Sequence, residues 1–183
     1  MLKKILVAAL PIFVLLAIPF FLRPASGAPS DAPAEKLEII SAHNESIKYE
    51  YDRAFRQYYR DRFGRDIELD FRSPGGTSDI VKYIADRYEA EFRHFFESDP
   101  ANGEWTPEIA KRFAEPGVEN DPTAPEAVRK ARKLFLSSDV GIGIDLMAGG
   151  GTFDMQRHAK RGFAVDGGAQ KRHPEYFADD VIP

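Results

Sequence analysis

One pattern occurs three times in this chain, and it constrains the fold more than any other feature. A short stretch of strand-like apolar residues is followed by a loop rich in Gly, Ser, Thr or Asn, and then by apolar residues at helical spacing. The strand-like stretches are "KLEIISAHN", "DIELDFRS" and "DVGIGIDLMAGGG". Repeated strand–loop–helix units are typical of a right-handed parallel arrangement. The sequence therefore predicts an α/β fold with a parallel sheet of βα units.

Each expected helix has recognisable ends. Asn44 is a good N-cap for the first helix, and Gly64 is its expected C-terminal stop. Thr77 or Ser78 is expected to cap the second helix, whereas the third begins at Thr152 and stops at Gly162. Apolar residues at helical spacing predict the buried faces of the first two helices: Ile47, Tyr51, Ala54, Phe55 and Tyr58 in the first, and Ile80, Val81, Ile84, Tyr88, Phe92 and Phe95 in the second.

Residues 98–138 interrupt the pattern. Two short helices are expected here, "TPEIAKRF" and "TAPEAVRKARKLFL", each with a Thr as N-cap and a Pro in the first turn. The pieces between them are rich in Pro, Gly, Asn and Asp. We interpret 98–138 as a helical insert that lies on the surface.

The first 28 residues have the order of an export signal. Lys3 and Lys4 precede an apolar run over 5–22, and small residues follow at a cleavage site. The alternative is an uncleaved anchor in the inner membrane formed by 5–22. The chain is thus divided into a signal peptide (1–28), a Pro- and Ala-rich linker (29–36) and a solute-binding lobe (37–183).

Composition excludes several classes of function. The chain has no Cys, which excludes a lipoprotein anchor, disulfides and thiolate chemistry. It carries 25 basic and 29 acidic residues, and removal of residues 1–28 would take away basic ones only. A net acidic surface repels phosphate backbones, so we expect no nucleic-acid partner.

The three loops are candidate ligand contacts. The carboxyl ends of parallel strands share one edge of a sheet, and ligands bind there in open α/β folds. Glycines allow close approach to the backbone, while hydroxyls and helix N-termini favour an oxygen-rich or anionic group. The predicted ligand-binding residues are Ser41, Ala42, His43 and Asn44 in the first loop, Gly75, Gly76, Thr77 and Ser78 in the second, and Gly149, Gly150, Gly151 and Thr152 in the third.

Residues 37–85 and 139–165 resemble the N-terminal part of a known family. With "LEIISAHNESIKYEYDRAFRQYYRDRFGRDIELDFRSPGGTSDIVKYI" and "DVGIGIDLMAGGGTFDMQRHAKRGFAV", the chain is similar to type 2 periplasmic solute-binding proteins of ABC importers, most of all to the ferric-iron-binding branch. The resemblance implies the first lobe of a two-lobed receptor. Such a receptor is exported to the periplasm, is monomeric when complete, delivers a solute to an inner-membrane ABC permease, and has neither cofactor nor catalysis. Because a second lobe is missing, the chain resembles an N-terminal fragment.

The resemblance implies that His43 could be an iron ligand, because it stands where the ferric-binding members carry a histidine ligand. Their carboxylate ligand corresponds here to glycine, around Gly150, and their tyrosine pair lies in a portion that this chain does not contain. The pair Tyr58-Tyr59 is instead expected within a helix. Because Fe(III) prefers anionic oxygen donors, we rank a small polar or anionic solute above iron as the ligand.

Two other interpretations remain open. The stretch "DLMAGGGTF" resembles the first motif of Rossmann-like S-adenosylmethionine-dependent methyltransferases, although Met147 replaces its first glycine and Asp145 lacks a partner for acid–base work. Alternatively, the protein is a non-catalytic envelope protein that is anchored by 5–22 and binds a partner through 98–138. The remaining histidines, His94, His158 and His173, are expected to be exposed to solvent.

Overall fold

Three parallel strands form one sheet in the order β2-β1-β3. The computed structural model describes residues 35–176, and its strands are β1 (Glu35–Ser41), β2 (Ile67–Arg72) and β3 (Leu146–Ala148). In the pairing of β1 with β3, Ile39 lies opposite Leu146 and Ser41 lies opposite Ala148. The predicted α/β class with a parallel sheet is therefore confirmed.

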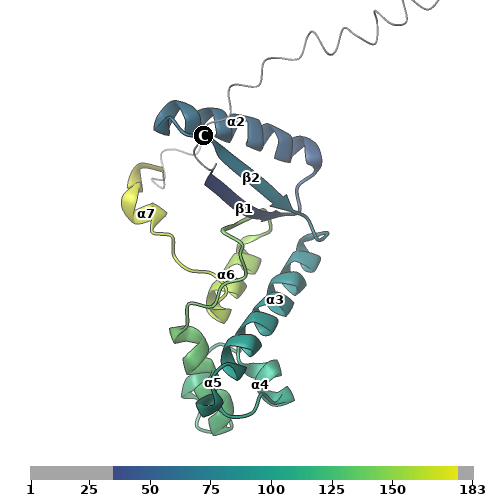
Figure 1. Cartoon of the computed structure of the whole chain (residues 1–183), viewed down its shortest axis with the longest axis vertical. Coiled ribbons are helices and arrows are strands. Elements are labelled where there is room, and N and C mark those ends of the chain that lie inside the picture. Colours follow the sequence, from purple (N-terminus) through teal and green to yellow (C-terminus); the bar gives the residue numbers. More distant parts are fainter. Residues whose placement is uncertain (1–34, 177–183) are drawn as a thin grey trace, which may run out of the picture. The chain divides into compact units, whose positions relative to one another are not determined.

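The helices follow the strands in the predicted order (Figure 1). The predicted signal peptide 1–28 lies outside the described residues, as does most of the predicted linker. Strand β1 begins at Glu35, two residues inside that linker. The helices are α2 (Glu45–Phe63), α3 (Thr77–Glu97), α4 (Pro107–Arg112), α5 (Glu126–Ser137), α6 (Thr152–Arg161) and α7 (Ala169–Arg172), with 3-10 turns η1 (Pro100–Asn102), η2 (Val118–Asn120) and η3 (Pro174–Tyr176).

The two faces of β1 pack against different helices. Leu37 and Ile39 line a hollow beneath α2, whereas Ile40 lies in the buried cluster with Ile80 and Ile84 of α3. This alternation follows from the period of two in a strand. Helices α2 and α3 therefore lie on opposite faces of the sheet.

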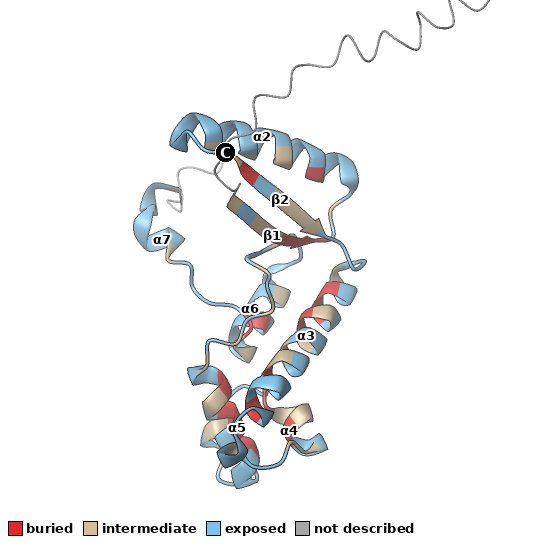
Figure 2. Ribbon diagram, viewed as in Figure 1, coloured by how far each residue is buried: buried red, intermediate tan, exposed pale blue. Residues whose placement is uncertain are grey.

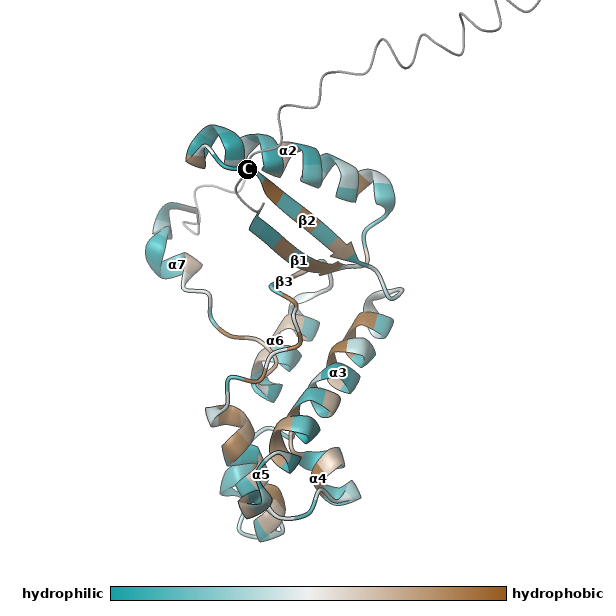
Figure 3. Ribbon diagram, in the orientation of Figure 1, coloured by the Kyte–Doolittle hydropathy of each residue, from teal (hydrophilic) through white to brown (hydrophobic). Residues whose placement is uncertain are grey.

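Helix α2 has the predicted ends but not the predicted buried face. Asn44 Oδ1 accepts a hydrogen bond from the Ile47 N–H, and Gly64 adopts φ 67° at the C-terminus. However, Ile47, Tyr51 and Tyr58 are exposed. Figure 3 shows a largely hydrophilic helix. The predicted face was wrong because Tyr51 and Phe55 border an open hollow between helix and sheet rather than packed atoms.

The segment 98–138 is helical as predicted, but its surface placement was wrong. Ile109, Phe113, Val128 and Phe135 are buried, and they form the main cluster together with Phe92 of α3. Figure 2 shows this buried group where α3, α4 and α5 meet. The ring of Phe92 lies 5.1 Å from that of Phe113 and 5.0 Å from that of Phe135. Each such ring contributes about 2–3 kcal/mol by its burial, so the insert holds much of the core.

Three local predictions need correction. Helix α3 has Gly76 as its N-cap, with the Asp79 carboxylate accepting the Gly76 N–H, so Thr77 is already helical. Its buried face includes Phe96 at 2% exposure, whereas Phe95 is 38% exposed. Thr106 caps α4 as predicted, but Thr123 hydrogen-bonds Asp121 and α5 begins after Pro125.

The third strand is shorter than its alternating apolar residues predict. Val140, Ile142 and Ile144 pack against the core, yet only Leu146–Ala148 pairs as a strand. Gly143 adopts φ 67°, a left-handed conformation that interrupts an extended chain. Helix α6, in contrast, spans the predicted residues and ends at Gly162 with φ 83°.

The buried side chain of Arg132 in α5 holds the C-terminal end of α6. Its guanidinium donates from Nη1 to the carbonyl oxygen of Arg161 at 2.6 Å and from Nη2 to that of Lys160 at 3.1 Å. Arg132 is 2% exposed, and its Nε lies 3.5 Å from a carboxylate oxygen of Glu119. The last carbonyls of a helix lack helical partners, so this contact satisfies them while Glu119 balances the charge.

We expect Arg132→Met to lower the free energy of unfolding by about 3 kcal/mol, because it leaves the α6 carbonyls unpaired and the Glu119 carboxylate without its counter-ion. Urea denaturation measures this loss. The control is Lys133→Met on the exposed side of α5, which should change stability by less than about 0.5 kcal/mol. Equal stability of the two variants would contradict this role of Arg132.

Candidate functional site

The three predicted loops lie in contact with one another at the carboxyl end of the sheet. A β-carbon placed on Gly149 would lie 3.0 Å from Cε1 of His43. A β-carbon on Gly150 would lie 3.4 Å from Cγ2 of Thr77. Both glycines adopt positive φ, 101° and 85°. The glycine turn after β3 therefore fills the space between the first and second loops, and larger residues would not fit it without a shift.

His43 lies at the point where the sheet changes winding direction. After β1 the chain continues into α2 on one face of the sheet. After β3 it continues into α6 on the other face, where α6 and α3 line the same hollow. Ligands of open parallel sheets bind in the crevice between two such strands. His43 and Gly149 lie beside each other at this point.

The His43 ring is held by its own strand. Its Nδ1 lies 2.8 Å from Oγ of Ser41, and the same oxygen accepts the His43 N–H at 3.2 Å. The ring of Tyr51 lies 6.4 Å away. Nε2 has no hydrogen-bond partner within residues 35–176. The ring is thus fixed through one nitrogen, and the other can bond a ligand.

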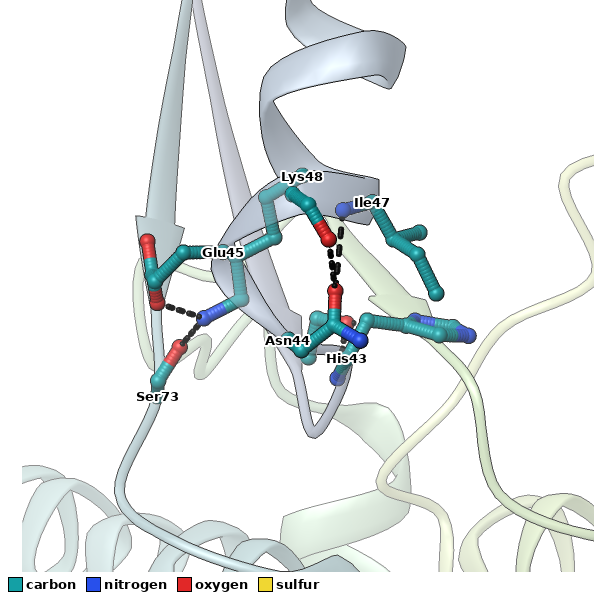
Figure 4. A network of polar contacts seen from close by, with 8 residues as sticks. His43, Asn44, Glu45, Ile47, Lys48 and Ser73 are labelled. Atoms are coloured by element: carbon teal, nitrogen blue, oxygen red, sulfur yellow. Dashed lines mark hydrogen bonds and ion pairs between the residues drawn. The ribbon is translucent and has the colours of Figure 1, made fainter.

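A polar network joins the first loop to the strand end of the second (Figure 4). Lys48 is buried in the first turn of α2, and its Nζ donates to Oε1 of Glu45 at 2.8 Å and to Oγ of Ser73. Next to it, Oδ1 of Asn44 accepts the Ile47 N–H at 3.0 Å. Because a buried ammonium needs such partners, Lys48 fixes α2 relative to the end of β2.

The predicted residues border two different hollows. Ser41, His43 and Gly149 line an apolar hollow of about 260 Å³ between α2 and the sheet. Thr77 and Ser78 line a polar hollow of about 440 Å³ between α3 and α6. Seven predicted residues line neither of these two hollows: Ala42, Asn44, Gly75, Gly76, Gly150, Gly151 and Thr152.

Charged residues of the polar hollow were missed by sequence reasoning. Besides Thr77 and Ser78, it is lined by Lys82, Asp154, Arg157 and Arg161. Arg157 and Arg161 are four residues apart in α6 and therefore share a face of that helix. This spacing is visible in the sequence, but only the structure shows that the face lies beside the second loop. The hollow therefore combines hydroxyls with a surplus of positive charge.

The iron role of His43 stays a prediction. Within residues 35–176, no group of three or more His, Cys, Asp or Glu side chains could hold a metal ion. In the same residues, no helix is both long and apolar enough to cross a membrane. The apolar run 5–22 lies outside them.

His158 corrects a sequence prediction. It is 3% exposed, not solvated, and it lines a hollow of about 300 Å³ with Tyr88 and Met147. Neither ring nitrogen has a hydrogen-bond partner in the described part of the chain. Burial lowers the pKa of His158, and the positive charges of Arg161 and Arg157 lower it further. The imidazole is therefore neutral at pH 7.

Comparison of the chain with protein-family models, with curated proteins and with solved structures found no match.

The lowered pKa of His158 predicts a loss of stability in acid. The unfolded chain binds this proton near pH 6.5, whereas the folded chain resists it, so stability is complete above that pH and falls below it. We expect the unfolding free energy of the wild type to decline as the pH falls below about 6.5, and that of His158→Gln to decline less. Chemical denaturation at several pH values measures both slopes. The exposed His94, changed to Gln, is the control and should keep the wild-type slope; a wild-type slope in His158→Gln would contradict the prediction.

Proposed function

We propose that the protein is the solute-binding component of an ABC importer, and that its α/β unit is one lobe of a type 2 periplasmic binding protein. The observation that carries the proposal is the contact of three strand-to-helix loops at one sheet edge, around Gly149 and Gly150. In this proposal the chain is exported to the periplasm, performs no catalysis and presents its ligand to an inner-membrane permease.

The solute that best suits this edge is small and anionic or polar. The N-terminal ends of α3 and α6 meet here, and helix N-termini attract negative charge. The N-cap of α6 is Gly151, which has no side chain to accept the first amides of the helix. Arg157 and Lys82 add positive charge beside Thr77. Backbone amides, a hydroxyl and basic side chains are the groups that bind carboxylates and oxyanions.

Ferric iron ranks below such a solute. Fe(III) prefers anionic oxygen ligands. In the hollow that His43 lines, the described side chains offer the hydroxyls of Ser41 and Tyr51 and the ammonium of Lys48, but no carboxylate. Asp154 supplies a carboxylate close to the glycine turn, 3.8 Å from a β-carbon on Gly150. We therefore propose a metal-free solute and keep iron as a separate arm of the test.

We expect at least one small oxygen-rich solute to raise the melting temperature of the purified chain. The panel contains phosphate, sulfate, citrate, glutamate and glucose, with Fe(III) and S-adenosylmethionine as separate arms. We call the sheet edge formed by the three loops the three-loop rim, or the rim. His43→Ala and Thr77→Val each remove a polar side chain from this rim. Each should weaken binding of the solute that gives the thermal shift about tenfold. Isothermal titration calorimetry measures the affinities.

Two matched variants control for general effects. His94→Ala and Thr123→Val make the same changes at exposed positions away from the rim, and they should leave affinity unchanged. No thermal shift with any solute, or shifts that both rim variants retain, would overturn the proposed site. A shift with S-adenosylmethionine alone would instead favour the methyltransferase interpretation.

A further inference from the structure

A further hollow lies between α6 and the C-terminal end of α4 with the residues that follow it. Its volume is about 580 Å³. One wall consists of Lys111, Arg112, Ala114, Glu115 and Pro116, and the other carries Phe153, Gln156, Arg157, Lys160 and Arg161 of α6. Ala114 and Pro116 add apolar surface. This volume is within the range of small-molecule sites, roughly 300–1,000 Å³.

The hollow is strongly basic although the chain as a whole has a net charge of −4. Five of its ten lining residues are basic: Lys111, Arg112, Arg157, Lys160 and Arg161. Its one acidic residue, Glu115, lies 2.7 Å from Nε of Arg112. Arg112 is also 3.9 Å from Glu108. The carboxylates of Glu115 and Glu108 therefore both pair with Arg112 and neutralise that cation alone.

The other four cations have no ion-pair partner in the described part of the chain. Some exposed basic side chains of the protein pair along their own helix, as Arg87 does with Glu91 and Arg93 with Glu97. Arg157, Lys160 and Lys111 form no such pair. Asp154 is one turn from Arg157, but it lines the neighbouring hollow between α3 and α6 and not this one. Like charges gathered without partners repel one another, and an anion relieves that repulsion.

Among these cations, Arg161 is held in place by the packing of α6. Arg132 holds the last carbonyls of the helix, and the guanidinium of Arg161 lies 4.7 Å from the centre of the Phe163 ring. Burial lowers the pKa of Arg161, and the nearby charges of Arg157 and Arg132 lower it further. Arg161 remains protonated at pH 7. Because the Arg161 guanidinium is already held in place, ligand binding does not have to order it, and this lowers the entropic cost of binding.

We propose that this hollow binds a small ligand carrying two or more phosphate groups. Planar guanidinium groups bond phosphate oxygens in pairs, and ammonium groups add point charges, so Arg157 and Arg161 with Lys160 and Lys111 suit one phosphate on each wall. The ligand is either a free oligophosphate or the headgroup of a phospholipid. Arg157 and Arg161 line both this hollow and the polar hollow beside Thr77, whereas Lys111 and Lys160 line only this one of the two. Substitution of either lysine therefore distinguishes the two sites.

Calorimetric titration of the purified chain with pyrophosphate tests the proposal. The wild type should bind it, and affinity should fall as NaCl is raised, because the contacts are ionic. Arg157→Gln/Lys160→Gln should weaken binding about tenfold or more. Lys111→Gln, on the opposite wall, should weaken it as well. The control is Lys133→Gln/Lys171→Gln, which removes the same charge from exposed positions elsewhere and should retain affinity.

Two further comparisons distinguish a lipid headgroup from a free phosphate ligand, and the basic hollow from the three-loop rim. Binding to vesicles of cardiolipin, which carries two phosphates, and phosphatidylcholine, but not to pure phosphatidylcholine or to pyrophosphate, would assign a lipid headgroup. Binding of pyrophosphate would assign a free ligand. If His43→Ala and Thr77→Val abolish pyrophosphate binding while Lys111→Gln does not, the phosphate binds at the rim and the present inference is wrong. Absence of binding to both probes, or equal loss in the control variant, would also overturn it.

Discussion

The buried guanidinium of Arg132 is the contact on which the arrangement of the other parts depends. It comes from α5, within the segment between the second and third strands, and it bonds the carbonyl oxygens of Arg161 and Lys160. A charge this deeply buried is tolerated only because carbonyls and Glu119 surround it. Since α6 follows β3 directly, this one side chain connects the aromatic cluster of Phe92, Phe113 and Phe135 to the sheet edge.

The positive φ angles of two glycines, Gly149 and Gly150, determine how the three loops approach one another at the carboxyl end of the sheet. Gly149 and Gly150 have positive φ and bring the third loop against His43 and Thr77, where a β-carbon would crowd either neighbour. Lys48 and Asn44 hold the start of α2 on the opposite side of the same turn. Backbone amides, an imidazole and hydroxyls thus lie within one small region. The proposed receptor function depends on this closeness and not on any single residue.

Sequence reasoning located the strands, the loops and most helix ends, because these depend on local signals such as Asn44, Gly64 and Gly162. It failed where burial depends on distant partners. The sequence of residues 98–138 is typical of a surface segment because Pro, Gly and Asp separate its apolar residues. In the folded chain, however, Phe113 and Phe135 pack against the Phe92 ring. His158 looks solvated among Arg and Lys in the sequence, although its side chain points inward. The basic residues of α6 escaped notice because their neighbours come from α3 and α4.

The two ends of α6 are held very differently, and this has a mechanical consequence. Its C-terminal end is fixed by Arg132 and by Phe163, which is stacked on Tyr88 with ring centres 4.5 Å apart. Its N-terminal end follows three consecutive glycines and has no side-chain cap. Thermal displacement of a segment is largest where fewest buried contacts restrain it. The end of α6 at Gly151 is therefore restrained by fewer side-chain contacts than the end at Arg161, and we expect the larger displacement at Gly151.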